Sequence, residues 1–278
     1  MATRPQIGRW KTAGERGGFT LLELLVVIAI MGFLAATSVP AIRALTQTNK
    51  EASGERQVLD ELTLARQLAL NHRRTVYLLL LPAFPAEAQR DAVLSSPRIR
   101  DPRERRRVAG LITNLFQQQF RAYALFSRRS VGDQPGQGTP RYLSEWRTLP
   151  EGLLFTTNKF VYLDKGQWEA VSASVPLERR PLPWALFPFP TAESPLMVLP
   201  YVAFDSLGRI HYDDDRRPAR PGEVVSISRG SVFYPLDARG LVNLRSAPDI
   251  TINPKDNRVD IMINWLTGRA RVLKPEMP

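Results

Sequence analysis

Glu23 is the residue of this chain whose chemistry most needs a partner. It is the only charged residue in a run of 21 mostly apolar residues, 19–39, and it follows Phe19 by four positions. An ionised carboxylate at the centre of a membrane helix costs about 2.5–3.5 kcal/mol on insertion scales. Near the start of a helix the cost is lower, because the side chain can reach the interface and the helix dipole favours an anion. Glu23 could therefore be merely tolerated, or it could pair with a cation.

A second chemically distinctive feature is a dense arginine run. Its members are Arg98, Arg100, Arg103, Arg105, Arg106 and Arg107. We interpret this run as a solvated loop, with contact to the phosphates of nucleic acid or to lipid headgroups as the functional alternative. Further along, Tyr123 and Phe126 are interleaved with Arg121, Arg128 and Arg129, which could stack single-stranded bases. Aromatic residues on a half-buried strand are more often core, and we favour that interpretation.

Other titratable groups offer little material for catalysis. Asp213, Asp214 and Asp215 could supply oxygen ligands to calcium, but neighbouring arginines favour an ordinary charged loop. The chain has two histidines, His72 and His211, and no cysteine, which excludes disulfides, cysteine-ligated zinc and thiol chemistry. No phosphate-binding loop, nucleophile elbow or metal-ligand spacing occurs. We therefore expect no enzyme activity, no cofactor and no metal among the assigned sites, with calcium at 213–215 left open.

Composition indicates a folded protein with a basic surface. The 278 residues are 44% hydrophobic and 23% charged, which is typical of a globular chain. Net charge is +11; residues 1–18 hold four basic residues and one acidic residue, or +3, so the remainder carries +8. A basic balance bears on solubility and on association with anionic partners.

The elements that position Glu23 are predicted to be one long helix. Residues 19–39 would extend roughly 31 Å as a helix, enough to cross a bilayer core. The basic leader should stay in the cytoplasm, so that the C-terminal bulk crosses the membrane. A cleaved secretory signal, with an apolar region of about 7–15 residues, and an uncleaved signal anchor are the rival interpretations.

Beyond this run, Pro40 should kink or loosen the helix. The helix should then continue from Ala41 to about Asn71, giving about 53 residues in all. Four apolar residues fall on one stripe of this second half: Val58, Leu62, Ala65 and Ala69. We expect this stripe to pack on a globular domain.

The rest of the chain is predicted to be rich in strands. Strands are expected at 75–81, 120–126, 153–155, 160–163, 201–204, 224–227 and 259–265. Turns are expected at 164–166, 207–208 and 267–268, and loops at 132–140. Segments 82–118 and 176–200 look like insertions, the second as a surface loop rich in proline. The predicted fold class is α+β, with a long N-terminal helix packed on an antiparallel sheet.

Gly17-Gly18-Phe19-Thr20-Leu21-Leu22-Glu23, after a basic leader, resembles the class III signal of type IV pilins and type II secretion pseudopilins. Three further stretches resemble the general secretion pathway protein H and FimT-like minor pilins. They are residues 64–76, Phe204-Asp205-Ser206-Leu207-Gly208-Arg209, and Thr267-Gly268-Arg269-Ala270-Arg271-Val272. The resemblance implies a pilin-like fold with a leader at 1–18, an assembly half at 19–40, an amphipathic half at 41–71 and a globular domain at 72–278.

The resemblance also implies a processing reaction. Prepilin peptidase would cut after Gly18 and N-methylate the Phe19 amine. Gly18 lacks a Cβ, so a peptidase can approach its backbone closely. The new ammonium group would lie about one helical turn from Glu23, and the Glu23 of one subunit would pair with the Phe19 amine of the next.

The function implied is that of a minor pilin or pseudopilin, a structural subunit at or near the tip of a secretion pseudopilus or a type IV pilus. It would be a single-pass protein of the inner membrane, with its N-terminus in the cytoplasm and its globular domain in the periplasm or outside. Its partners would be prepilin peptidase, other subunits, the inner membrane and exported protein cargo. Two alternatives stay open: a DNA-binding minor pilin of an uptake system, and a membrane-anchored protein outside any filament.

Overall fold

The computed structural model describes residues 20–130, 132–134, 138–213, 221–252 and 258–273, with the backbone alone at 39–47, 165, 172 and 173. It divides into two compact units, Met1–Thr48 and Asn49–Pro278. Helix α1 (Leu21–His72) begins in the first unit and ends in the second. The predicted long helix is therefore confirmed, and Pro40 lies within it without ending it.

The second unit contains two antiparallel sheets. The first has the order β3-β2-β1-β7-β6, with β4 beside β2 and β8 beside β7; the second has the order β10-β9-β11-β12, with β5 beside β9. The first sheet comprises β1 (Val76–Leu80), β2 (Ala122–Ser127), β3 (Arg141–Tyr142), β4 (Arg147–Thr148), β6 (Trp184–Pro188), β7 (Leu196–Phe204) and β8 (Ile210–His211). The second comprises β5 (Leu153–Phe155), β9 (Gly222–Phe233), β10 (Asp249–Ile252), β11 (Val259–Asn264) and β12 (Ala270–Leu273). The α+β class with antiparallel sheets is confirmed.

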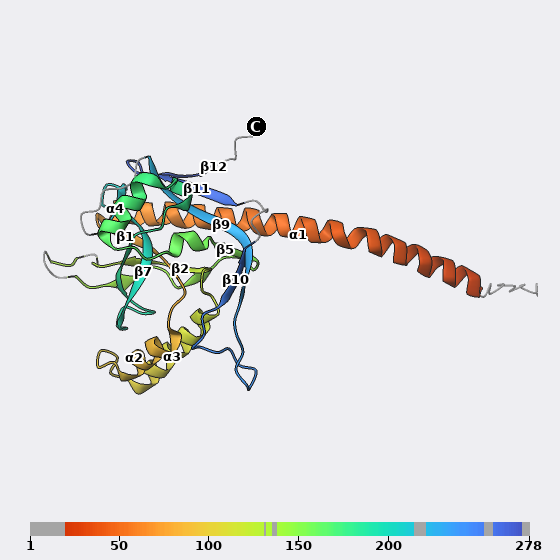
Figure 1. Cartoon of the computed structure of the whole chain (residues 1–278), viewed down its shortest axis with the longest axis horizontal. Coiled ribbons are helices and arrows are strands. Elements are labelled where there is room, and N and C mark those ends of the chain that lie inside the picture. Colours follow the sequence, from red (N-terminus) through yellow and green to blue (C-terminus); the bar gives the residue numbers. More distant parts are fainter. Residues whose placement is uncertain (1–19, 131, 135–137, 214–220, 253–257, 274–278) are drawn as a thin grey trace, which may run out of the picture. The chain divides into compact units, whose positions relative to one another are not determined.

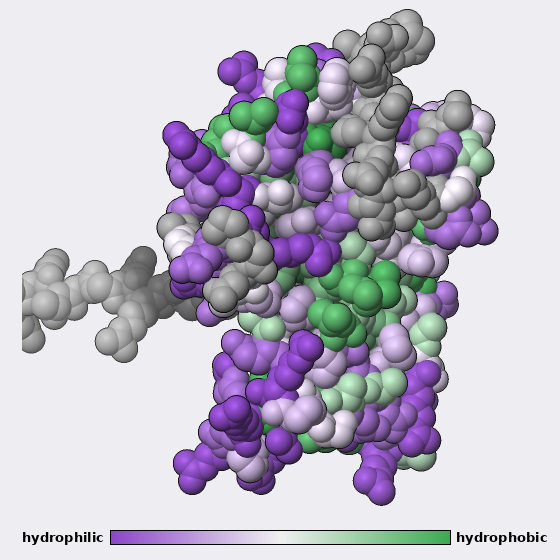
Figure 2. Space-filling model, turned by 90° about the vertical axis from the view of Figure 1, so that its left-hand side faces the viewer, coloured by the Kyte–Doolittle hydropathy of each residue, from purple (hydrophilic) through white to green (hydrophobic). Residues whose placement is uncertain are grey.

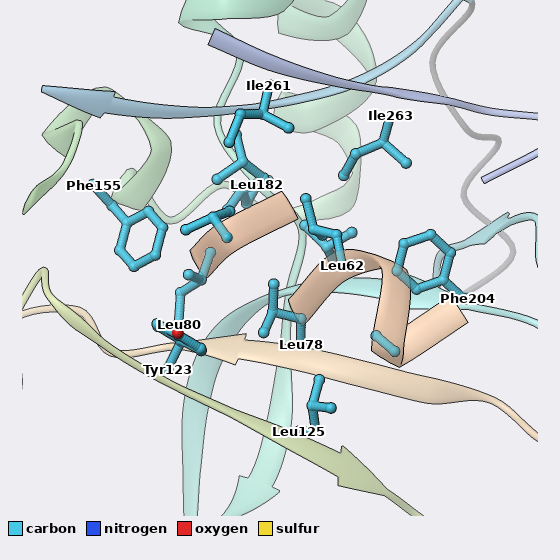
Figure 3. Packing of buried hydrophobic residues seen from close by; sticks show 14 of the residues in the cluster. Leu62, Leu78, Leu80, Tyr123, Leu125, Phe155, Leu182, Phe204, Ile261 and Ile263 are labelled. Carbon is cyan, nitrogen blue, oxygen red and sulfur yellow. The ribbon is translucent and has the colours of Figure 1, made fainter. Parts of the chain in front are cut away.

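The second half of α1 is buried between the two sheets. Val58, Leu62, Ala65 and Ala69 are each at most 1% exposed, which confirms the predicted stripe. Figure 3 shows Leu62 between Leu78 of β1 on one side and Ile263 of β11 on the other. The two alanines on the stripe allow close approach of the strands, because their side chains end at Cβ. The helix therefore supplies the centre of the larger hydrophobic core.

The opposite face of the first sheet is covered by two further helices, α2 (Ala86–Ser95) and α3 (Pro102–Phe116) (Figure 1). Along β1, Leu78 and Leu80 belong to the α1 core, whereas Tyr77 and Leu79 belong to the second core under α2 and α3. This alternation follows from the period of two in a strand. Because both faces of β1 are covered, all five of its residues are buried, and its sequence shows no alternation of apolar and polar residues.

The expectation of a solvated loop at 98–107 is wrong for its second half, which starts helix α3. Asp101 is the N-cap, and its side chain accepts a hydrogen bond from the Arg103 backbone N–H at 2.8 Å. Pro102 takes the first helical position, where its missing N–H costs nothing. Val108, Ile112, Leu115 and Phe116 recur on one buried face, so packing stabilises the helix although arginines crowd its first turns.

Residues 176–200 do not form the expected surface loop. They contain the short helix η2 (Leu177–Arg179), strand β6 and the start of β7, and Phe187 and Phe189 are completely buried. β6 is an edge strand, a position that tolerates proline because one row of N–H groups has no sheet partner.

Two smaller predictions around residue 162 are also wrong. The expected strand at 160–163 is replaced by the end of helix η1 (Thr157–Phe160), followed by irregular chain. The expected turn at 164–166 is the start of α4 (Lys165–Ser174), where Asp164 and Gln167 form a reciprocal capping box. An Asp-x-x-Gln sequence carries that signal. By contrast, the strand interpretation of 120–126 is confirmed from Ala122 onward.

The turns at 207–208 and 267–268 are confirmed, and they meet beside the end of α1. Gly208 and Gly268 both have positive φ, +72° and +61°. Arg66 of α1 donates from Nε to the Thr267 carbonyl oxygen at 2.7 Å. A Cβ added at Gly268 would overlap the Gly208 carbonyl oxygen. The two glycines are therefore required both by backbone conformation and by the close approach of two turns.

We predict that Gly268→Ala will lower the free energy of unfolding by about 3 kcal/mol or more, since it combines a left-handed residue with a backbone clash. Gly240→Ala is the matched control: its φ is +74°, but nothing lies within 4 Å of an added Cβ. That change should cost only about 1–2 kcal/mol. Denaturant unfolding followed by tryptophan fluorescence measures both. Equal losses of stability in the two variants would contradict the expected clash between a Cβ at position 268 and the Gly208 carbonyl oxygen.

Glu61 is a buried carboxylate on α1. It is 2% exposed; Oε2 accepts from Arg147 Nη1 at 2.7 Å, while Oε1 is buried with no hydrogen-bond partner among the described residues. Burial raises the pKa of Glu61, and Arg147 opposes this shift in part. The folded state therefore binds this proton more tightly than the unfolded chain does.

The sign of this shift gives a pH prediction. The contribution of Glu61 to stability should be complete below its unfolded pKa and should be lost as pH rises through the raised folded pKa. Glu61→Gln removes the titration, so the stability of wild type relative to the variant should fall as pH rises from about 4 to 7. Urea unfolding of both proteins over that range measures it. A difference that rises with pH would contradict the prediction.

Candidate assembly segment

The first turns of α1 are apolar and exposed. Leu21 is 87% and Phe33 69% exposed, and no part of Leu21–Ser38 is buried against the rest of the described chain. By length and composition this segment could cross a membrane. An apolar surface of this extent is unfavourable in water, so lipid or other protein chains must cover it in the working state.

The start of α1 is capped by Thr20. Its Oγ1 accepts from the Glu23 backbone N–H at 3.2 Å, and its carbonyl oxygen accepts from the Leu24 N–H at 3.1 Å. Thr20-Leu21-Leu22-Glu23 thus matches the Ser/Thr-x-x-Glu pattern of a capping box. Sequence reasoning missed the cap formed by Thr20, although the Thr-x-x-Glu spacing carried the signal.

Glu23 remains the charge that the segment must accommodate. Within the described residues no ion pair to its carboxylate is found. Gly18 and Phe19, the predicted processing residues, lie outside the described residues, so the Phe19–Glu23 pair stays a prediction. The Thr37 hydroxyl, by contrast, is satisfied inside the helix by the carbonyl oxygens of Phe33 and Leu34, at 3.3 and 3.0 Å.

The arginine run is dispersed over α3 and the segment before it. Arg107 pairs with Glu104 at 2.7 Å, and the Nε atoms of Arg105 and Arg106 donate to backbone carbonyls. Arg98 and Arg100 line a cleft of about 360 Å³ that also contains Glu104 and Glu193. Arg107 lines a separate cleft of about 480 Å³ beside Tyr142 and Trp146. The six side chains therefore do not converge on one site, and contact with nucleic acid or lipid stays a prediction.

The aromatic residues and the aspartates singled out in the sequence have other roles in the described part of the chain. Tyr123 and Phe126 are at most 1% exposed, so they belong to the core and cannot stack bases. Asp213 pairs with Arg128 at 2.8 Å and accepts from the Tyr77 hydroxyl at 3.0 Å. Asp214 and Asp215 lie outside the described residues, so the structure does not test a calcium site there.

Comparison with known proteins identifies the N-terminal segment. Residues 15–39 match the family described as the prokaryotic N-terminal methylation motif. The chain carries a prepilin-type N-terminus. This motif marks pilin-like structural subunits, and it implies processing by prepilin peptidase and assembly with other pilin subunits. Neither a curated protein nor a solved structure matches the chain.

The match and the exposed apolar helix agree with each other. The matched residues run from the end of the basic leader through all of Leu21–Ser38, the segment that could cross a membrane. Together they fit a membrane-anchored, type IV pilin-like protein.

Proposed function

We propose that this chain is a minor pilin or pseudopilin, a structural subunit of a type II secretion pseudopilus or a type IV pilus, similar to general secretion pathway protein H and FimT-like minor pilins. The observation that carries the proposal is the coincidence of two features. The prepilin-type motif at 15–39 contains the exposed apolar segment Leu21–Ser38, and the one charged residue of that segment, Glu23, lies in the first turn of α1. A structural subunit needs no catalytic site, and the proposal assigns none.

Processing would create a cationic partner for Glu23. Cleavage after Gly18 frees the Phe19 amine, and methylation by the same peptidase keeps it basic. In a filament the Glu23 carboxylate of one subunit would pair with the Phe19 ammonium group of a neighbour, in surroundings of low dielectric. Loss of one partner of such a pair leaves a buried charge uncompensated, which costs about 3–5 kcal/mol.

Small residues in the segment support helix packing. Ala29, Gly32 and Ala36 recur at intervals of three and four residues and so share one face of α1. Nothing lies within 4 Å of a Cβ added at Gly32, so this face is open to another helix. Small residues let membrane helices approach closely enough for dispersion contacts and weak hydrogen bonds.

The globular part supports the role of a minor component. The leader would be 1–18, the assembly half 19–40, the amphipathic half 41–71 and the globular domain 72–278, in the periplasm or outside the cell. The α2–α3 pair, inserted between β1 and β2, adds a layer to the sheet face opposite α1. A repeated major subunit would have to fit this layer into every lattice position, whereas a subunit at the tip would not.

Cleavage can be tested at its predicted site. Mass spectrometry of the protein from its native membrane should find a mature chain that begins at N-methylated Phe19. Gly18→Val should block cleavage, because a branched Cβ obstructs approach to the scissile bond. Gly8→Val, a matched change within the leader, should leave processing intact. An uncut wild-type chain would refute the proposal.

The charge of Glu23 can be tested separately from the capping-box pattern at the start of α1. Glu23→Gln keeps a capping-box residue but removes the charge, so filament incorporation should fall about tenfold or more, with expression and cleavage unchanged. Glu23→Ala should be at least as defective. Glu55→Gln, a charge removal on the same helix within the second unit, is the control. Normal incorporation of Glu23→Gln would eliminate the proposed pairing.

A further inference from the structure

A basic cleft lies where α1 ends and β1 begins. It has a volume of about 550 Å³ and is lined by the last residues of α1, the start of β1, the end of β2 with the chain that follows, and the turn between β7 and β8. Figure 2 views the molecule from the end at which α1 stops, and much of that face is hydrophilic around a central hydrophobic area. Four arginines line the cleft: Arg73, Arg74, Arg128 and Arg129.

The acidic groups that line or border this cleft are already engaged. Asp205 pairs with Arg209 at 2.8 Å and also accepts from the backbone N–H groups of Leu207 and Arg209. Asp133 accepts from the backbone N–H groups of Ser130 and Thr139 and from the Thr139 hydroxyl. These carboxylates hold their own turns in place, and Asp133 also interacts electrostatically with Arg74 and Arg129. Two carboxylates against four arginines still leave the lining with an excess of positive charge.

Of the four arginines, Arg128 alone forms a salt bridge with a carboxylate among the described residues. It pairs with Asp213, and its guanidinium group lies 4.7 Å from the ring centre of Phe187 and 5.3 Å from that of Tyr77. Such stacking and pairing fix the side chain in one orientation. Arg128 therefore forms a rigid wall of the cleft.

Arg74 and Arg129 are held in place without losing their charges. Arg74 donates from Nη1 to the Arg129 carbonyl oxygen at 2.6 Å, and its buried Nε has no hydrogen-bond partner among the described residues. Arg129 donates from Nη2 to the Gln134 carbonyl oxygen at 3.1 Å. Burial, and to a smaller extent Arg141, lowers the pKa of Arg74, and Asp133 opposes this shift in part.

Arg73 occupies a strained backbone position. Its φ is +48°, and the neighbouring bonds from Arg73 N to Leu70 O and from Arg74 N to Ala69 O close α1 as in a Schellman motif. Glycine is the residue that this position favours, because any Cβ is crowded there. The chain instead places a guanidinium group at the rim of the cleft, and strain of this kind is concentrated at ligand sites.

We propose that this cleft binds a phosphate group, held by Arg73, Arg74 and Arg129 against the wall formed by Arg128. Three guanidinium groups that form no salt bridge within the described part of the chain match a phosphate, with about 1.5–2 negative charges, better than a single carboxylate. Their planar donor pairs also suit its oxygens. The helix dipole accounts for one cation at the end of α1, but not for Arg129, which belongs to the chain after β2. The phosphate could be free or part of a nucleic-acid backbone.

The test uses the full chain in detergent, titrated with inorganic phosphate and, separately, with a single-stranded oligonucleotide over a salt series. Whichever of the two probes binds, Arg129→Gln should weaken its binding about tenfold. Arg73→Gly should weaken it as well while raising the melting temperature, because it relieves the strain at φ +48°. Arg103→Gln, an exposed arginine on α3 outside the cleft, should change neither.

The results distinguish free phosphate from the phosphates of a nucleic-acid backbone, and both from failure of the proposal. Binding of inorganic phosphate with no oligonucleotide competition indicates a free anion; tight oligonucleotide binding that phosphate displaces indicates the backbone. Either result supports phosphate binding in the cleft if Arg73→Gly and Arg129→Gln weaken that binding and Arg103→Gln does not. Absence of binding by both probes, or equal weakening by Arg103→Gln, overturns the proposal. The inference does not rest on filament assembly, so its failure would leave the pilin proposal untouched.

Discussion

The structure depends on one helix that meets two environments. Val58, Leu62, Ala65 and Ala69 of α1 are buried between two antiparallel sheets, and each sheet uses them to complete the core on its inner face. The Leu21–Ser38 part of the same helix is apolar all round and exposed. A helix with one apolar stripe belongs on a protein core, and a helix apolar on every side belongs in lipid or among other such helices.

The charges near the two ends of α1 have the signs that its dipole favours. Glu23 lies in the first turn, where partial positive charge accumulates, and Arg73 and Arg74 directly follow the last turn, where partial negative charge does. This pattern also clarifies the proposed processing. An ammonium group freed at Phe19 would stand at the positive end of the helix, so a nearby carboxylate such as Glu23 is needed to offset the repulsion.

A buried polar network fixes the segment between β5 and β6 to the second sheet. The side chains of Lys159 and Glu223 are at most 1% exposed, and Lys159 Nζ lies 3.6 Å from Glu223 Oε1. The Lys159 Nζ also donates to the Leu177 carbonyl oxygen at 2.8 Å, and the Tyr212 hydroxyl donates to Glu223 at 2.6 Å. Burial lowers the pKa of Lys159, and Glu223 opposes that shift. Such a network specifies one arrangement of its segments, because any other would leave a charge buried without a partner.

The sequence by itself determined the features that depend on local pattern: the apolar run with Glu23, the stripe from Val58 to Ala69, most strands, and the turns at Gly208 and Gly268. These follow from periodicity and from backbone preferences within a few residues of each position. Only the tertiary structure decided that 98–107 enters a helix, that β6 forms an edge strand, and that Arg73, Arg74 and Arg129 meet in one cleft. These three features result from burial and from electrostatic contacts between residues that are distant in the chain, and such contacts cannot be predicted from a local sequence pattern. Helix α3, for example, is stabilised because its buried residues join Tyr77, Phe126 and Tyr201 of distant strands in the second core.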